Sequence, residues 1–172
     1  MPGKSLWWWL ILGVGLLLGC GVAPTPAARS REGVALWAIG EAMSRPGLRS
    51  LEEVLEPGGL PAGVEPQYFI VWGEPPADDR PFVRDEVVHG VWIGVEGRLY
   101  ATDEETYRRY RPRCGDGRLT CVRFAILEFS EDEAVLQIDT FIAPLAGRGE
   151  RITLQWAGDD WKVTHIEGIW IS

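Results

Sequence analysis

The last fifty residues of the chain, 120–172, carry the pattern that most restricts what the chain can fold into. They contain four runs rich in β-branched, aromatic or alternating apolar residues, and polar turns at residues 130–133 and 158–159 follow the first and third runs. Such runs, joined by short turns, predict consecutive antiparallel strands. The predicted strands are Thr120–Phe129 and residues 134–142, 151–156 and 161–165. Together they should form a four-stranded meander with one buried face.

The alternation within the last hairpin also predicts its register. A turn at Gly158 and Asp159 places Trp156 opposite Trp161, and the other pairs follow from the two-residue period of a strand. On the buried face we expect Trp156 with Trp161, Leu154 with Val163 and Ile152 with His165; on the solvent face, Gln155 with Lys162 and Thr153 with Thr164. Beyond these pairs the alternation slips, which predicts a bulge near Glu167.

The preceding hundred residues are expected to cover the buried face. An apolar stripe over residues 32–44 predicts an amphipathic helix, and capping boxes at residues 50–53 and 102–105 each predict the start of a short helix. Three more strands are predicted before the last of these helices, over residues 67–72, 87–94 and 98–101. We therefore expect one α+β domain over residues 32–172, with N-terminal helices packed on a curved antiparallel sheet that ends in the four-stranded meander.

The charge balance argues against one class of partner. The chain has 17 Lys and Arg against 25 Asp and Glu, a net charge of −8, and no block of basic residues interrupts this acidic background. Proteins that bind nucleic acid neutralise phosphates with clustered Lys and Arg. We therefore expect no nucleic-acid partner.

The first twenty residues resemble the signal of a bacterial lipoprotein. Lys4 precedes an apolar run over residues 6–18, which is shorter than the roughly 20 residues of a membrane span. The run ends at Leu17-Leu18-Gly19-Cys20, a stretch that resembles a lipobox. The resemblance implies that residues 1–19 are a signal peptide and that Cys20 is acylated after cleavage. The competing interpretation is an ordinary signal peptide with an incidental cysteine.

The lipobox implies a location and a spacer. Two or three acyl chains on Cys20 give stable anchoring, so the resemblance implies an extracytoplasmic protein of the cell envelope, held to a membrane by lipid. Residues 20–31 contain prolines and small residues but no large apolar side chain, which predicts a flexible tether.

The other two cysteines, Cys114 and Cys121, flank a Gly-Asp-Gly turn. Disulfides persist in exported proteins, so we expect these two residues to be joined. A metal site is the alternative, but the two histidines, His89 and His165, are distant in sequence and no Cys-x-x-Cys motif is present. No cofactor or metal is therefore predicted.

The element order and the stretch Trp161-Lys162-Val163-Thr164-His165 resemble the nuclear-transport-factor-2-like superfamily, which includes ketosteroid isomerase and polyketide cyclases. In several of its families a further His and Ser follow this stretch, where the chain has Glu167 and Ile169. The resemblance implies helices over the concave face of a curved sheet. It also implies a cone-shaped cavity that binds small apolar ligands, or is filled, or a sheet that forms dimers.

Candidate pocket residues follow from that resemblance: they are Tyr68, Asp139, Trp161 and His165, with Arg123 and His89 also considered. Asp139 would be the carboxylate base of an isomerase-like site. Its competing interpretation is a charge on the solvent face, opposite Phe124 and on the other face from Arg123. His165 has the competing interpretation of a hydrogen-bonded core histidine, and Tyr68 that of a packing residue.

The sequence therefore predicts an exported lipoprotein whose domain binds a small apolar ligand or an envelope protein. Two alternatives remain: an isomerase- or cyclase-like enzyme with a carboxylate in a cone-shaped pocket, and a structural or assembly factor of the envelope. No nucleophile elbow, P-loop or metal-ligand motif is found, so no catalytic residues are assigned.

Overall fold

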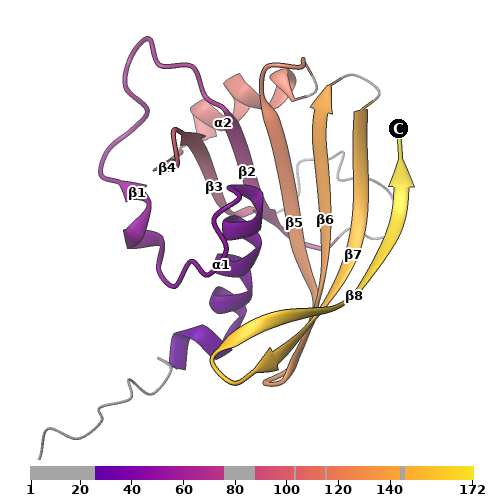
Figure 1. The fold of residues 1–172 in the computed structure, drawn as a ribbon. Helices are drawn as coiled ribbons and strands as arrows, with labels where there is room; N and C mark the ends of the chain where they lie inside the picture. Colours follow the sequence, from indigo (N-terminus) through magenta and orange to yellow (C-terminus); the bar gives the residue numbers. More distant parts are fainter. Residues whose placement is uncertain (1–25, 76–87, 103, 115, 144–145) are drawn as a thin grey trace, which may run out of the picture.

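The computed structural model describes residues 26–75, 88–102, 104–114, 116–143 and 146–172. Eight strands form one sheet in the order β1-β4-β3-β2-β5-β6-β7-β8 (Figure 1). The strands are β1 (Leu55–Glu56), β2 (Tyr68–Gly73), β3 (Val88–Val95), β4 (Arg98–Ala101), β5 (Thr120–Phe129), β6 (Glu133–Ala143), β7 (Ala146–Ala157) and β8 (Asp160–Ile171). The α-helices are α1 (Arg31–Ala42) and α2 (Glu104–Tyr110), and the 3-10 helices are η1 (Pro26–Arg29), η2 (Leu51–Glu53) and η3 (Arg111–Arg113).

The predicted fold class is wrong, because the protein is mostly sheet. Within the described residues only α1 and α2 are α-helices, and the sheet is mixed rather than antiparallel. The capping box at Ser50 and Glu53 is present, but it opens only the three-residue η2 before the chain enters β1. A capping box specifies how a helix starts and not how far it continues. The segment before the meander therefore mainly contributes strands to the sheet, and it supplies few helices that could cover the sheet.

Two parallel pairs make the sheet mixed. β2 lies beside β5, with Phe69 opposite Cys121 and Val71 opposite Arg123, and β1 lies beside β4. Parallel strands need a long crossover, and the crossover from β2 to β5 contains β3, β4 and α2. Because this pairing joins segments fifty residues apart, the alternation within each strand does not predict it.

The pairing of β5 to β8 in succession is confirmed, and so is the closed end of the last hairpin. Trp156 pairs with Trp161, Gln155 with Lys162 and Leu154 with Val163, as predicted, but Val163 is 44% exposed rather than buried as expected. The next two predicted pairs are wrong, because Thr153 pairs with His165 and Ile152 with Ile166. A bulge at Thr164 causes the shift, and the Thr164 hydroxyl donates to the Thr153 carbonyl oxygen at 3.2 Å. A second shift leaves Ile169 without a partner residue.

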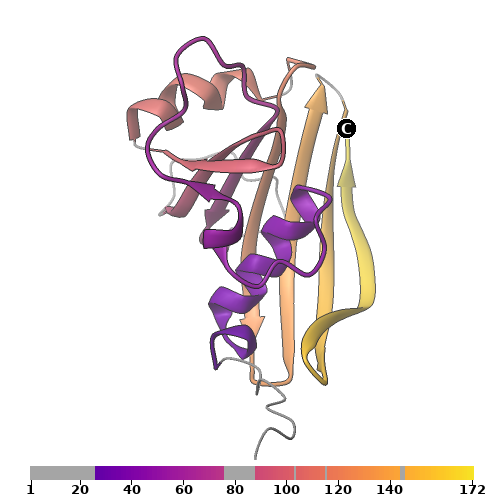
Figure 2. The same ribbon diagram turned by 60° about the vertical axis from the view of Figure 1, so that its left-hand side comes forward.

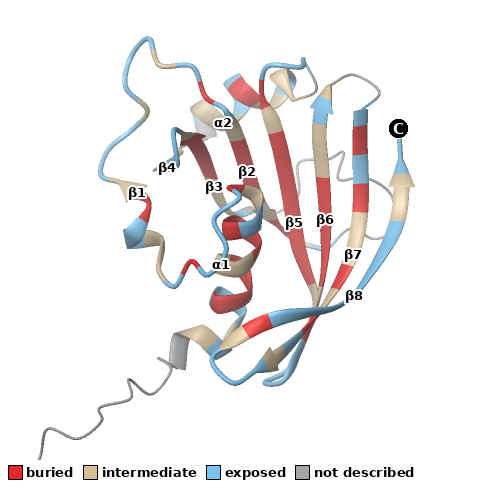
Figure 3. Cartoon of the chain, in the orientation of Figure 1, coloured by how far each residue is buried: buried red, intermediate tan, exposed pale blue. Residues whose placement is uncertain are grey.

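The larger core lies between α1 and one face of the sheet (Figures 1 and 2). The Ser30 hydroxyl caps α1 by accepting from the Gly33 amide at 3.2 Å. The helix buries Val34, Ala38 and Ile39 against apolar side chains of the central strands. Figure 3 shows buried residues concentrated in α1 and in β2, β5 and β6, whereas most of β8, at the sheet edge, is exposed. We call this side of the sheet the α1 face.

A smaller core lies on the opposite face, near α2 and η3. Its buried members come from β2, β3, the end of α2, the residue before β5 and β5 itself: Phe69, Val71, Ile93, Tyr110, Leu119 and Cys121. α2 and η3 immediately precede the segment that leads into β5, so they sit at the end of the sheet where β5 begins. This second side, which we call the groove face, has a helix over only part of its width.

The described chain begins at the other end of the sheet. Arg29 donates through Nε to the Glu131 carbonyl oxygen at 2.6 Å and also pairs with Asp132 in the turn between β5 and β6. The indole nitrogen of Trp161 donates to the Ala28 carbonyl oxygen at 3.0 Å. These contacts fix η1 beside the β5–β6 and β7–β8 turns, away from α2 (Figure 1).

Candidate functional site

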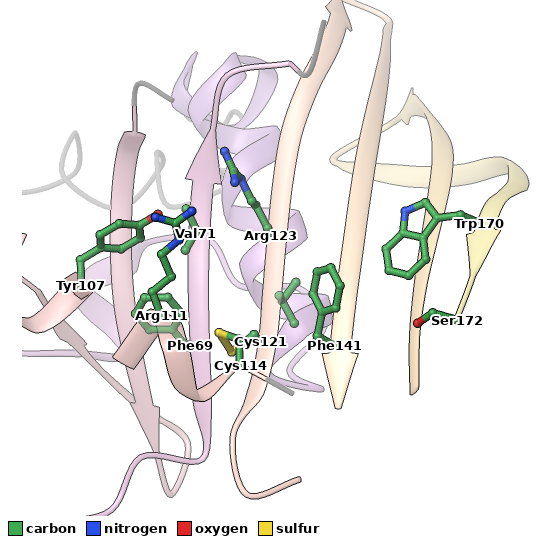
Figure 4. A pocket seen from close by; sticks show the side chains of 11 residues that line it. Phe69, Val71, Tyr107, Arg111, Cys114, Cys121, Arg123, Phe141, Trp170 and Ser172 are labelled. Carbon is green, nitrogen blue, oxygen red and sulfur yellow. A yellow bond between two sulfur atoms is a disulfide. The ribbon is translucent and has the colours of Figure 1, made fainter. Parts of the chain in front are cut away.

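A half-open groove of about 460 Å³ lies on the groove face (Figure 4). Its side chains come from β2, η3, β5, β6 and the last residues of the chain, with one from α2. The lining residues are Phe69, Val71, Tyr107, Arg111, Cys114, Cys121, Val122, Arg123, Phe141, Trp170 and Ser172. The lining is therefore largely aromatic and apolar, with two guanidinium groups.

Strand alternation explains how these side chains reach one surface. Phe69 and Val71 are two residues apart in β2, and their partners in β5 are Cys121 and Arg123. Paired residues in adjacent strands point to the same face. Phe141 continues the row on β6, opposite Cys121. Three adjacent strands thus build the floor of the groove.

The far wall of the groove is formed by Trp170, and glycine makes its position attainable. A Cβ atom added to Gly149 of β7 would overlap the indole nitrogen of Trp170 and would lie 2.6 Å from Oδ1 of Asp139. With no side chain there, the indole crosses β7 and tilts against the ring of Phe141, with 5.2 Å between the ring centroids. The Trp170 indole nitrogen also donates to Asp139 Oδ1 at 2.8 Å.

Asp139 is buried, which corrects its predicted place on the solvent face. Its side chain is 0% exposed, and the Gln137 amide nitrogen lies 3.3 Å from Oδ2. Its partner in β5 is Arg123 and not Phe124, which pairs with Ile138. Both Arg123 and Asp139 therefore belong to the groove face, whereas the sequence predicted opposite faces.

A single bulge accounts for this error. Near the turn, Phe129 pairs with Ala134 and Glu128 with Val135, which is the predicted register. Leu127 is then skipped, so that Ile126 pairs with Leu136. One extra residue in β5 shifts every later pair by one position, and a shift of one position changes which residues share a face.

Arg123 lies in the floor of the groove and is only 8% exposed. Its guanidinium group packs on Gly73 at the end of β2, where an added Cβ would lie 3.2 Å from both Nε and Nη2. Arg123 is therefore a buried residue of the floor and not a rim residue. Figure 4 shows its side chain between β2 and β5.

Tyr107 and Arg111 form the rim nearest α2, and sequence reasoning missed both. The ring of Tyr107 stacks on Phe69 at 5.8 Å, and the guanidinium carbon of Arg111 lies 5.9 Å from the centroid of the Tyr107 ring. The sequence predicts a helix here, but it contains no signal that would place this helix against the second face of the sheet.

The predicted disulfide is confirmed, with 5.4 Å between the Cα atoms of Cys114 and Cys121. Both cysteines line the groove, so the bridge fastens the end of η3 to β5 at its floor. In the connecting turn, a hydrogen bond from the Arg118 amide, at 2.8 Å, lowers the pKa of Asp116, and Arg113 lowers it further.

The four predicted pocket residues are not brought together. Of the four, only Asp139 contacts a residue that lines the groove, since it is fully buried and accepts a hydrogen bond from Trp170. Trp161 and Tyr68 belong to the core of the α1 face, and His165 is exposed on β8. The other candidate, His89, lies 2.8 Å from Glu74 and tilts against the ring of Trp72.

The described part of the chain contains neither a candidate metal site nor a candidate membrane-spanning helix. It holds no group of three His, Cys, Asp or Glu side chains that could bind a metal ion. None of its helices has the length and apolar character needed to cross a membrane.

Comparison with known proteins gave no relative. No protein-family model, curated protein sequence or solved structure matches this chain.

Proposed function

We propose that this chain is an exported lipoprotein, anchored through Cys20, whose folded domain binds a small apolar ligand in the groove. The observation that carries the proposal is the groove itself, with four aromatic rings from Phe69, Tyr107, Phe141 and Trp170 around about 460 Å³. Small-molecule sites are typically concave, mostly apolar and roughly 300–1,000 Å³ in volume, with a few polar groups that orient the ligand.

The placement of the groove suits an anchored receptor. Residues 26–31 of the predicted tether belong to η1 and the start of α1, so the rest of the tether would leave the domain beside η1, which contacts the β5–β6 turn through Arg29. The groove lies at the other end of the same strands, near Ser172 and the start of β5. A domain held by lipid at residue 20 would thus carry its groove on the end away from the membrane.

Of the two resemblances found in the sequence, this proposal uses the lipobox and not the cavity of the nuclear-transport-factor-2-like superfamily. The lipobox-like stretch supports the anchor, and the described residues do not include it. The resemblance to the nuclear-transport-factor-2-like superfamily implies a cavity beneath the N-terminal helices, whereas this groove lies on the face opposite α1. Asp139 is not proposed as a catalytic base, because its carboxylate is fully buried and accepts the Trp170 indole hydrogen bond.

The binding test uses the full chain, purified from membranes and held in phosphatidylcholine nanodiscs. The probe is 2-naphthamide, a neutral aromatic molecule, and saturation-transfer NMR measures its dissociation constant against empty nanodiscs. Phe141→Ala should weaken binding about tenfold, because it removes a ring from the groove floor. Ile142→Ala is the matched control, since Ile142 is the next residue in β6 and is 55% exposed outside the groove. Absence of saturable binding, or equal effects of the two variants, would refute the proposed site.

A further inference from the structure

We propose that the ligand of the groove is an apolar molecule of one or two rings that carries an anionic group, and that Arg111 binds this group at the rim. The inference rests on the proposed function and specifies the ligand class for the same site. It starts from a contrast in charge. The chain as a whole has a net charge of −8, yet the two charged residues that line the groove, among those the structure describes, are both arginines.

The buried carboxylate of Asp139 does not cancel that charge at the groove surface. Asp139 shares the groove face but is 0% exposed, and Trp170 lies over it. Asp139 is also the strand partner of Arg123, so both residues lie on the groove face of adjacent strands. Arg111 lies apart from these two residues, half-buried on η3, and it places a guanidinium group at the rim of the groove.

One side of the groove carries the guanidinium group of Arg111, and the other carries the rings of Phe141 and Trp170 together with Ser172. Figure 4 shows Arg111 and Tyr107 at the side formed by α2 and η3, and Phe141 and Trp170 across the floor from them. A ligand with rings over Phe141 and Trp170 would therefore direct a charged substituent toward Arg111. The arrangement fits an amphiphilic molecule better than a uniformly apolar one.

Arginine is well suited to this role. Its guanidinium group has five N–H donors in a planar fork, so it can hold one protein contact and still donate two parallel hydrogen bonds to a carboxylate, sulfonate or phosphate. Charge-assisted hydrogen bonds are roughly twice as strong as neutral ones, and a partly desolvated rim weakens them less than open water does. The ring of Tyr107 beside Arg111 keeps the guanidinium group at the rim.

The test compares two probes that differ only in charge. 2-Naphthoate carries a carboxylate, and 2-naphthamide replaces it with a neutral amide of the same shape. Both are titrated by saturation-transfer NMR against the full chain in phosphatidylcholine nanodiscs. Arg111→Gln should weaken naphthoate binding about tenfold and change naphthamide binding by less than about twofold. Arg109→Gln, the same charge change at an exposed position of α2 outside the groove lining, should change neither.

Each outcome decides between the ligand class and the site. Two results together support the inference. Arg111→Gln should weaken the binding of naphthoate but not of naphthamide, and high salt should weaken naphthoate binding to the wild-type chain while naphthamide binding stays unchanged. Equal weakening of both probes, or no weakening of naphthoate, refutes the anionic ligand class but leaves an apolar groove. If neither probe binds the wild-type chain, both the ligand class and the proposed function are wrong.

Discussion

Replacement of Trp161 by alanine tests the register on which the second half of the fold depends. Trp161 is 2% exposed and packs edge-on against Trp156, with 5.4 Å between the ring centroids. It also contacts Phe129 across the sheet, at 6.2 Å, and its indole nitrogen donates to the Ala28 carbonyl oxygen. The side chain therefore joins β8 to β7, to the end of β5 and to the start of the described chain.

The expected loss of stability follows from these contacts. Truncation of a buried aromatic side chain to alanine costs about 3–5 kcal/mol, a large share of the roughly 5–15 kcal/mol that stabilise a domain. Trp161→Phe keeps a ring in the same space and loses the hydrogen bond to Ala28, so it should cost about 1–2 kcal/mol. Lys162→Ala should cost about 0.5 kcal/mol or less, because Lys162 is exposed and its ion pair with Asp160, at 3.4 Å, is a surface pair.

Urea unfolding followed by far-ultraviolet circular dichroism measures the three differences. The protein is the chain that starts at Cys20, with this residue changed to serine so that it stays soluble. A shift of one residue in the β7–β8 register would turn Trp161 outward and Lys162 inward. If Lys162→Ala were as damaging as Trp161→Ala, both the register and the core built on it would be refuted.

Three further predictions address the anchor, the bridge and the connecting turn. Cys20→Ser should release the protein from the membrane fraction or block processing of its leader, and mass spectrometry of the wild-type protein from membranes should show added acyl chains. Reduction of the Cys114–Cys121 bridge should lower the free energy of unfolding by about 2–3 kcal/mol, measured by urea unfolding with and without reductant. The folded pKa of Asp116 is lowered, so its stabilising effect is complete above the unfolded pKa and is lost as the pH falls through the folded pKa. Asp116→Asn should remove that part of the acid dependence, and an unchanged pH series would contradict this.

Most individual strands could be predicted from the sequence, because each one carries its own local pattern. β5 matches its predicted bounds, and β2, β3, β4 and β6 agree within one or two residues at each end. β7 and β8 are longer than predicted. The predicted strands are short because Gly147, Gly149 and Gly168 interrupt the alternation of apolar and polar residues. The assembly could not be predicted in the same way. The parallel pairing of β2 with β5 is a contact between distant segments, and nothing in either strand specifies its partner.

The groove was missed for a related reason. The sequence indicates candidate residues by chemical type and by a regular register, and one bulge at Leu127 is enough to place Asp139 and Arg123 on other faces than that register predicts. Trp170 follows the second register shift of the last hairpin, so its face could not be read from alternation either. The aromatic residues of α2 and η3 join the groove through tertiary packing that no local pattern records.

Gly149 is a signal in the sequence that points to the wall of the groove. A glycine in the middle of a long strand loses packing and raises the entropic cost of folding, so its presence suggests that something approaches the backbone there. In this protein the indole of Trp170 occupies that space and reaches Asp139. Gly149→Ala should therefore displace the indole, remove one hydrogen-bond donor from the buried Asp139 carboxylate and open the wall of the groove. Gly168→Ala, where an added Cβ meets no atom within 4 Å, is the matched control. The displaced indole should show as a shifted Trp170 side-chain signal in NMR spectra, together with weaker naphthamide binding, and unchanged values for both would mean that Trp170 does not form the wall.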